Sequence, residues 1–309
     1  MLKVCSSESS KRDCFGKYHE EFQYLRLIND ILDHGSMEEG RNGKAKTVFG
    51  SAMHFDLSEN TIPVLTTKKV AFKTCLKELL WFINGHTDNK LLKEQNVKIW
   101  NANASREFLD SRGLHNNKED DLGPVYGHQW RHFNAPYLGC NEDYSNKGVD
   151  QLNSIISSLN DPNNKYSRRL IMSAWNPCQL SDMVLPPCHV LYQFKVDTKK
   201  KTLSCILYQR SADIALGVPF NIASASLLTH VIAFLSNLKV GILTHFIGDG
   251  HIYEEHKEGL IHQLDRYLFP LPKLTLKQRN QKKPEDFCFQ DFILDGYLSN
   301  TSISFPLIV

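Results

Sequence analysis

The chain has 309 residues, 41% of them hydrophobic, and a formal net charge of +2. This apolar content can build a sizeable buried core, and length alone would suggest about two domains. The charge is too small to indicate nucleic acid or an anionic membrane as the main partner, so an anion site requires local clustering of Arg and Lys.

The eight cysteines form no CxxC pair and no Cys/His cluster with zinc-ligand spacing. The N-terminal stretch MLKVCSSESSKRDC lacks the apolar region of a signal peptide. We therefore expect reduced thiols in an intracellular, cytoplasmic protein without a metal site.

The first third of the chain contains two expected helices. Residues 1–19 are polar and without periodicity, which predicts a mobile extension ahead of one domain spanning 20–309. FQYLRLINDILDHG has the apolar spacing of an amphipathic helix that ends at a glycine. TVFGSAMHFDL predicts a strand pair or a bent strand, and FKTCLKELLWFING predicts a helix that is apolar almost all round.

The remainder of the chain is expected to be rich in strands. Residues 110–150 are rich in Asn, Asp, Gly and Lys, which predicts surface loops around DLGPVYGHQWRHF. RRLIMSAWN, HVLYQFKVD and KTLSCILYQRSADI are strand-like, and DTKKK between the last two is typical of a hairpin turn. The uncharged run from Asn221 to Leu238 contains Asn, Ser, Thr and His, so we expect a buried helix rather than a membrane span. With a further strand at ILTHFIGDGHIY, the pattern predicts the α+β class.

Cys188, in LPPCHVLYQF, could be a core residue, a disulfide half, a metal ligand or a nucleophile. A small buried hydrophobe is the commonest role of a cysteine. If CHVLYQF is a strand, His189 points to the opposite face and is poorly placed as the base of a Cys/His pair.

Four arginines are candidates for phosphate binding because a guanidinium donates two hydrogen bonds at once. Arg210 precedes a serine, and Arg41 lies on a glycine-containing loop. Arg168 and Arg169 are adjacent, so on a strand they would face opposite sides and could not easily serve one pocket. For each arginine taken singly, a solvated surface residue is the favoured interpretation. A cationic pocket would lower the pKa of a nearby thiol such as Cys188.

Glu78 lies three or four residues from Cys75, Trp81 and Phe82 on its predicted helix. Such apolar neighbours raise the pKa of a carboxyl group and suit it to proton transfer near neutrality, although a lysine partner is an equal alternative. Asn221 opens the uncharged helix, where an N-cap is the usual role of Asn and reading the edge of a pyrimidine is the other.

Several of these residues stand in motifs that follow one another closely: LPPCH, LYQRSAD, LGVPFNIAS and GDGHIY, preceded by TTKK, ELLWFI, KIW, DLGPVYGHQWRHF and RRLIMSAWNP. From about residue 20 to its C-terminus the chain resembles the thymidylate synthases. The insertions around 106–120 and 138–148 are similar to those of eukaryotic and some viral members.

The resemblance implies a single α+β domain with a large bent mixed sheet flanked by helices, paired sheet to sheet in a homodimer. It also implies reductive methylation of dUMP to dTMP with 5,10-methylenetetrahydrofolate as co-substrate, giving dihydrofolate. No metal, membrane or nucleic acid is required for that reaction.

The resemblance further assigns catalytic roles. Cys188 matches the nucleophile that adds to C6 of uracil, with Arg210 beside the phosphate. Asn221 matches the reader of uracil O4 and N3–H, and Glu78 the carboxylate that acts through water at O4. Tyr126 matches a tyrosine that assists proton removal at C5.

The implied binding residues form two sets. Those for dUMP, with one arginine pair reaching into the partner's site, are Arg41, Arg168, Arg169, Gln209, Arg210, Ser211, Asp213, Asn221, His251 and Tyr253. Those for the folate, including a closing C-terminal tail, are Trp100, Asn103, Leu185, Asp213, Gly217, Phe220 and Val309.

The chain departs from the family pattern in the loop RNGKAK, at Lys69, Asn101 and Ala225, and in the C-terminal GYLSNTS. Two alternatives share the expected fold: a deoxycytidylate hydroxymethylase, whose members carry Asp at the position of Asn221, and a binding homologue without turnover. A cysteine hydrolase is disfavoured because no base is placed for it.

Overall fold

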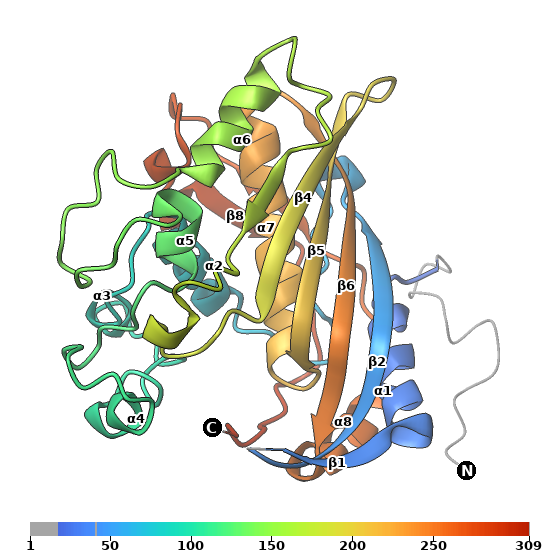
Figure 1. Ribbon diagram of the computed structural model, residues 1–309. Helices are drawn as coiled ribbons and strands as arrows, with labels where there is room; N and C mark the ends of the chain where they lie inside the picture. The colour runs from blue at the N-terminus through green and yellow to red at the C-terminus, as the bar shows by residue number, and fades with distance from the viewer. Residues whose placement is uncertain (1–17, 41, 309) are drawn as a thin grey trace.

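The computed structural model describes residues 18–40 and 42–308. Its main feature is a six-stranded mixed sheet with the order β1-β2-β6-β5-β4-β3 (Figure 1). β5 runs parallel to β6, and the other described neighbours in this sheet are antiparallel. The strands are β1 (Ser36–Gly40), β2 (Gly43–Asp56), β3 (Ile171–Ser173), β4 (His189–Asp197), β5 (Thr202–Asp213) and β6 (Lys239–Tyr253), with β7 (Lys273–Leu276) and β8 (Phe292–Asp295) in a separate antiparallel pair.

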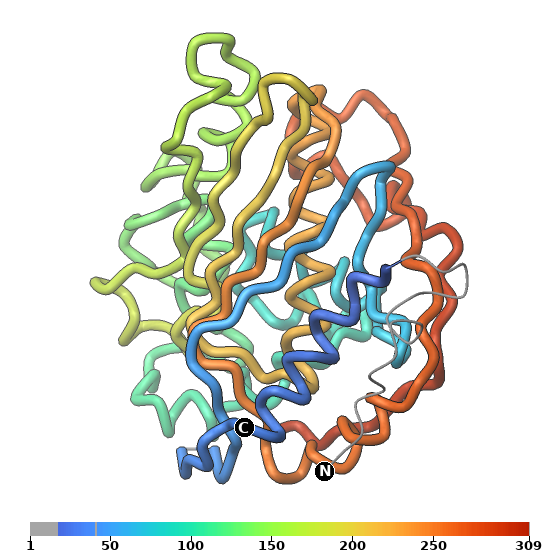
Figure 2. The backbone as a smooth tube through the Cα atoms, turned by 90° about the vertical axis from the view of Figure 1, so that its right-hand side faces the viewer, coloured from blue at the N-terminus to red at the C-terminus, as the bar shows by residue number. Residues whose placement is uncertain are grey.

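Eight α-helices accompany the sheet in the described part of the chain. They are α1 (Phe22–His34), α2 (Phe72–Ile83), α3 (Lys90–Lys93), α4 (Arg106–Ser111), α5 (Tyr126–His132), α6 (Gln151–Asn160), α7 (Gly217–Leu235) and α8 (Lys257–Leu264). α7 packs against β5, β6 and α2, and one contiguous cluster of buried apolar side chains joins these elements. Figure 2 shows the sheet turned toward the viewer with α7 behind it. The predicted α+β class is confirmed.

The amphipathic first helix, the apolar second helix and the three long strands lie where the sequence predicts them. In β2, Gly50 adopts a φ of +85°, a conformation that favours glycine, and interrupts the extended backbone. The bent-strand alternative is therefore the correct one. α7 is, by length and hydropathy, the one described helix that could cross a membrane, and 78% of its apolar window is buried within the fold, as expected of a core helix.

Three sequence expectations are wrong. β3 begins at Ile171, so Arg168 and Arg169 precede the strand and strand alternation does not separate them. Residues 112–125 and 133–150 are irregular as expected, but the segment around Tyr126 between them is buried and forms α5. Asn221 is not an N-cap, because α7 begins four residues earlier, at Gly217.

The sheet also has a face with exposed apolar side chains. Tyr208, Ile242 and Phe246 are exposed on neighbouring strands, and Phe49 of β2 is 85% exposed. Large exposed apolar side chains on neighbouring strands of one sheet suit an interaction site.

Of the predicted N-terminal extension, residues 1–17 lie outside the described residues. His19 is buried, and its Nε2 lies 2.7 Å from the carbonyl oxygen of Phe269. Arg41 and Val309, two predicted site residues, also lie outside the described residues.

Candidate active site

Cys188 is a free cysteine directly before β4, at the end of an irregular segment that contains two prolines. Its backbone N–H donates to Tyr126 Oη at 2.8 Å, and its carbonyl accepts from Arg210 N at 2.9 Å. These two bonds fix the backbone of Cys188 between α5 and β5. The thiol is thereby held at one point although its neighbours lie far apart in the sequence.

The Arg210 guanidinium approaches the thiol to within 4.0 Å, measured from Nη2 to Sγ. Burial raises the pKa of Cys188, and the nearby Arg210 only partly offsets this effect. Arg210 lowers the pKa of the thiol, as the sequence predicted, but burial outweighs this effect. Arg210 can still stabilise the thiolate once a proton is removed.

Arg210 is held in place by the two prolines that precede Cys188. Its Nε donates to Pro187 O and its Nη2 to Pro186 O, each at 2.9 Å. The guanidinium also lies over the Trp175 ring, 5.5 Å from the centroid. No described residue accepts a hydrogen bond from Nη1, so one edge of the guanidinium remains available to an anion.

A cavity of about 370 Å³ opens beside Arg210. Four predicted dUMP residues line it, namely Arg210, Ser211, His251 and Tyr253. Its other walls come from β1, β2 and β6. His251 Nδ1 lies 3.1 Å from Asp249 Oδ1, which orients the imidazole toward this space. The structure thus brings these four residues together, whereas the exposed Arg168 and Arg169 do not line this cavity.

The amide of Asn221 is oriented by Gln209, which is buried. Gln209 Nε2 donates to the carbonyl oxygen of Ser211 and to Asn221 Oδ1, both at 2.9 Å. Because a backbone carbonyl can only accept, this contact decides which end of the Gln209 amide carries nitrogen. Asn221 therefore turns its oxygen toward Gln209 and keeps its NH₂ group for another acceptor.

His245 supports the other end of the Gln209 amide, and the sequence analysis did not identify it. Its Nε2 lies 2.8 Å from Gln209 Oε1, and the side chain is fully buried. Burial lowers the pKa of His245 to about 3, so the imidazole is neutral and donates from Nε2. The alternation of apolar and polar residues along β6 was the one sequence signal for its inward direction.

Glu78 accepts a hydrogen bond from Trp100 Nε1 at 2.8 Å. Burial raises the pKa of Glu78 to about 7, and the Trp100 bond opposes this increase only in part. No ion pair of the described residues includes Glu78. The structure therefore favours the predicted proton-transfer environment over the lysine-paired alternative.

Tyr126 and His189 lie between Cys188 and the core. Tyr126 is buried, with its ring 6.4 Å from Trp100 and 5.4 Å from His189, and burial raises its pKa. Burial lowers the pKa of His189 to about 4, so this imidazole is neutral. Such a low pKa makes His189 a weak base, and the expectation that it is poorly placed to activate the thiol stays a prediction.

The predicted folate residues adjoin the start of α7. A Cβ on Gly217 would lie 3.5 Å from Asn221 Oδ1 and 3.7 Å from Asp213 Cβ, which places these three residues side by side. Burial opposes ionisation of Asp213, but His256 and backbone N–H groups hold its pKa below the usual value. Phe220 is half-buried at the start of the same helix.

The other predicted folate residues are Leu185, Trp100 and Asn103. Leu185 and Trp100 are half-buried against the core. Asn103 lies in the loop before α4 and makes no hydrogen bond to the other described candidate residues. Within the described ranges, no group of three or more His, Cys, Asp or Glu side chains could hold a metal ion.

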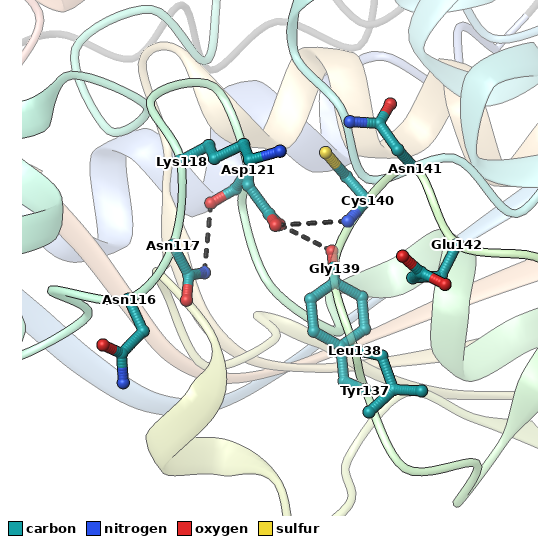
Figure 3. Close-up of a pocket in the computed structure, with 10 residues that line it drawn as sticks. All are labelled: Asn116, Asn117, Lys118, Asp121, Tyr137, Leu138, Gly139, Cys140, Asn141 and Glu142. Carbon is teal, nitrogen blue, oxygen red and sulfur yellow. Dashed lines mark hydrogen bonds between the residues drawn. The ribbon is translucent and has the colours of Figure 1, made fainter.

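A second cavity, of about 240 Å³, lies where the two predicted insertions meet (Figure 3). The buried Asp121 anchors it by accepting from Tyr137 Oη at 2.6 Å and from Cys140 N at 3.1 Å. None of the predicted site residues lines this cavity. The candidate active site is therefore the one around Cys188 and Arg210.

Comparison with known proteins identifies relatives along nearly the whole chain. The family model described as thymidylate synthase matches residues 22–309. The thymidylate synthase of Agaricus bisporus is 47% identical over 297 residues, covering 94% of this chain and 100% of the relative. The thymidylate synthase of Saccharomyces cerevisiae is 46% identical over 303 residues, covering 95% and 99%.

Some relatives are longer. The bifunctional dihydrofolate reductase-thymidylate synthase of Paramecium tetraurelia is 47% identical over 307 residues, which cover 99% of this chain and 65% of that protein. The chain thus spans about two thirds of the length of this relative.

Proposed function

This chain belongs to the thymidylate synthase family, and from that premise we propose that Cys188 is the nucleophile with which it methylates dUMP. The family uses 5,10-methylenetetrahydrofolate, which supplies both the one-carbon group and the hydride and leaves as dihydrofolate. The observation that carries the proposal is the convergence of Arg210 and Tyr126 on Cys188.

The first step is addition of the Cys188 sulfur to C6 of the uracil ring, which makes C5 nucleophilic. The thiol must first lose its proton, because burial raises the pKa of Cys188. The positive charge of Arg210 stabilises the thiolate that results, since it lies 4.0 Å from the sulfur. Tyr126 holds the Cys188 backbone through its hydroxyl oxygen, which leaves the hydroxyl proton free to interact near C5.

Glu78 and Asn221 act on the pyrimidine ring. Glu78, with a pKa of about 7, exchanges a proton near neutral pH and serves O4 through water. The NH₂ group of Asn221 faces away from Gln209, and we assign it as the donor to O4. Its Oδ1 can accept from N3–H as well, because a carbonyl oxygen has two lone pairs.

The cavity beside Arg210 suits the nucleotide phosphate and deoxyribose. Arg210 offers Nη1, Ser211 its hydroxyl, and His251 and Tyr253 the contacts to the 3′-OH. The folate would bind at the start of α7, against Asp213 and the half-buried apolar residues nearby. For these ligands the proposal rests on family membership together with the geometry of the described residues.

We also propose a sheet-to-sheet homodimer in which Arg168 and Arg169 enter the partner's phosphate site. Both arginines are exposed, and the apolar side chains of Tyr208 and Phe246 lie exposed on one sheet face. Subunit complementation tests this: Cys188→Ala and Arg169→Glu homodimers should each be inactive. Mixed heterodimers should regain activity at the one site with intact groups, and inactive heterodimers would refute the shared site.

The nucleophile is tested by trapping with 5-fluoro-dUMP and the folate, followed by mass spectrometry of peptides. Cys178 and Cys288 are exposed, whereas Cys188 is partly buried. Accessibility alone would therefore label the exposed cysteines, and the proposed mechanism labels Cys188. An adduct on either exposed cysteine in place of Cys188 would contradict the assignment.

A further inference from the structure

The last segment of the chain lies against the candidate site. Figure 1 shows the C-terminal end at the same end of the sheet as β1 and α8. Residues 301–308 form no helix or strand, so side-chain contacts must hold this tail. Pro306 O lies 2.8 Å from His256 Nε2, and the Phe305 ring packs 5.3 Å from the His256 ring. The ammonium of Lys68 lies 4.7 Å from the centroid of the Phe305 ring.

His256 faces Asp213 with its second nitrogen. The distance from His256 Nδ1 to Asp213 Oδ1 is 3.6 Å, and the His256 side chain is fully buried. Nδ1 makes no hydrogen bond with the described residues. The His256 imidazole therefore connects the tail to the Asp213 carboxylate at the start of α7. Asp213 precedes His256 by 43 residues, and Pro306 follows it by 50.

The tail carbonyl fixes which nitrogen of His256 carries a proton. Pro306 O can only accept, so Nε2 must donate to it. In a neutral imidazole Nδ1 would then present a lone pair to the Asp213 carboxylate, which is repulsive. When His256 is protonated, Nδ1–H faces the carboxylate favourably while Nε2–H keeps its bond to the tail.

The groups around His256 also favour its protonated form. Burial opposes protonation of His256, but Asp213, Pro306 O and Glu255 together raise its pKa above the usual value. Tyr253 packs edge-on to the imidazole at 5.5 Å. The other nearby charged or titratable groups are Lys68, which lies beyond Phe305, and His251, which lowers the pKa of Asp213. The carboxylate of Glu21 in turn raises the pKa of Lys68.

We propose that His256 is a positioning residue that, in its protonated form, joins the C-terminal tail to Asp213. The tail should then be docked before any ligand binds, and docking should respond to pH. Docking of the tail would also position Asp213 for the folate. This last step rests on the proposed function.

The direction of the pH dependence follows from the raised pKa of His256. The contribution of protonated His256 to tail docking is fully present below the ordinary histidine pKa of about 6.5. It is lost as pH rises through the higher pKa of the folded state. Burial lowers the pKa of Lys68 to about 8, so this residue titrates on the alkaline side. Measurements from about pH 5.5 to 7.5 therefore cover the expected change of charge on His256 while Lys68 stays largely protonated.

The test is limited proteolysis of residues 301–308 by proteinase K in the full chain without ligands, with the cleavage rate at each pH corrected by that of a free peptide of the same sequence. The wild-type tail should lose protection as pH rises. His256→Gln keeps a neutral donor, so it should show weaker protection with no pH dependence. His256→Phe keeps a ring without a donor and should lose about tenfold in tail protection at low pH.

Asp213→Asn provides an independent variant should His256→Phe disturb the fold, which a change in the far-UV circular dichroism would reveal. Loss of the carboxylate should move the loss of tail protection to lower pH. Wild-type protection in His256→Phe, the same pH dependence in His256→Gln, or an unshifted profile in Asp213→Asn would overturn the proposal. No substrate is present, so failure of the proposed activity would not affect these results.

Discussion

Replacing Glu78 by Gln should stabilise the protein above neutral pH while removing most of its activity. The variant retains an oxygen that can accept the hydrogen bond from Trp100 Nε1. It removes a carboxyl group whose pKa burial raises from 4.5 to about 7. Packing and volume are nearly conserved, so the difference between the two proteins reports on the charge.

The size of the effect follows from the pKa. A group whose folded-state pKa exceeds its unfolded value binds its proton more tightly when folded, so its stabilising effect exists at low pH and is lost as pH rises. For Glu78 the loss occurs between about 4.5 and 7 and corresponds to about 3 kcal/mol. Because Glu78 retains partial solvent contact, we expect about 1–3 kcal/mol.

The assay is urea unfolding of wild type and Glu78→Gln at about pH 4.5 and pH 8, at one protein concentration. The variant should be more stable at the higher pH, and its advantage should shrink at the lower. Glu94 is exposed beyond α3, so Glu94→Gln serves as the matched control and should show no such difference. Equal or lower stability of Glu78→Gln at pH 8 would refute the reasoning, and so would a difference independent of pH.

Further outcomes follow from the same geometry. Glu78→Gln should lose about 10²–10⁴-fold in kcat with little change in the KM for dUMP, in steady-state assays. Trp100→Phe removes the bond that opposes the raised pKa of Glu78, so the corresponding limb of the pH–rate profile should move up by about one unit. Asn221→Asp should shift the kcat/KM ratio toward dCMP by about 10-fold or more; undiminished dUMP preference would assign the reading to another residue. Glu21 is buried and accepts hydrogen bonds from two threonines, so Glu21→Ala should lower the free energy of unfolding by about 3 kcal/mol or more in urea.

Local sequence patterns predicted the helices and strands that are determined by residues close together in the chain. α1 has apolar side chains at helical spacing, and they are buried in the structure. β4 and β5 are joined by the expected turn. The position of Glu78 among apolar helix neighbours likewise predicted a carboxyl group with a raised pKa, because those neighbours lie one turn away.

Features that depend on distant partners were not predicted. His245 and His256 receive their roles from Gln209, Asp213 and Pro306, which come close only in the folded chain. The segment around Tyr126 contains Gly and Pro and resembles a loop, yet tertiary packing buries it. Long-range burial of this kind overrides local composition.

The residue at which a strand begins also depends on its pairing with a neighbouring strand. The sequence extended the strand back to Arg168, but its pairing with β4 begins at Ile171, opposite Gln193. Family resemblance placed both arginines in a partner's site without reference to the strand. That placement remains a prediction for the complementation experiment.

The central claim is that this chain methylates dUMP through Cys188. The most direct measurement mixes the purified protein with dUMP and 5,10-methylenetetrahydrofolate and follows the absorbance of dihydrofolate. Wild type should form dihydrofolate and dTMP in equal amounts, and Cys188→Ala should bind dUMP but form neither. A folded wild type that binds dUMP without forming product would contradict the account, as would a Cys188→Ala variant with undiminished turnover.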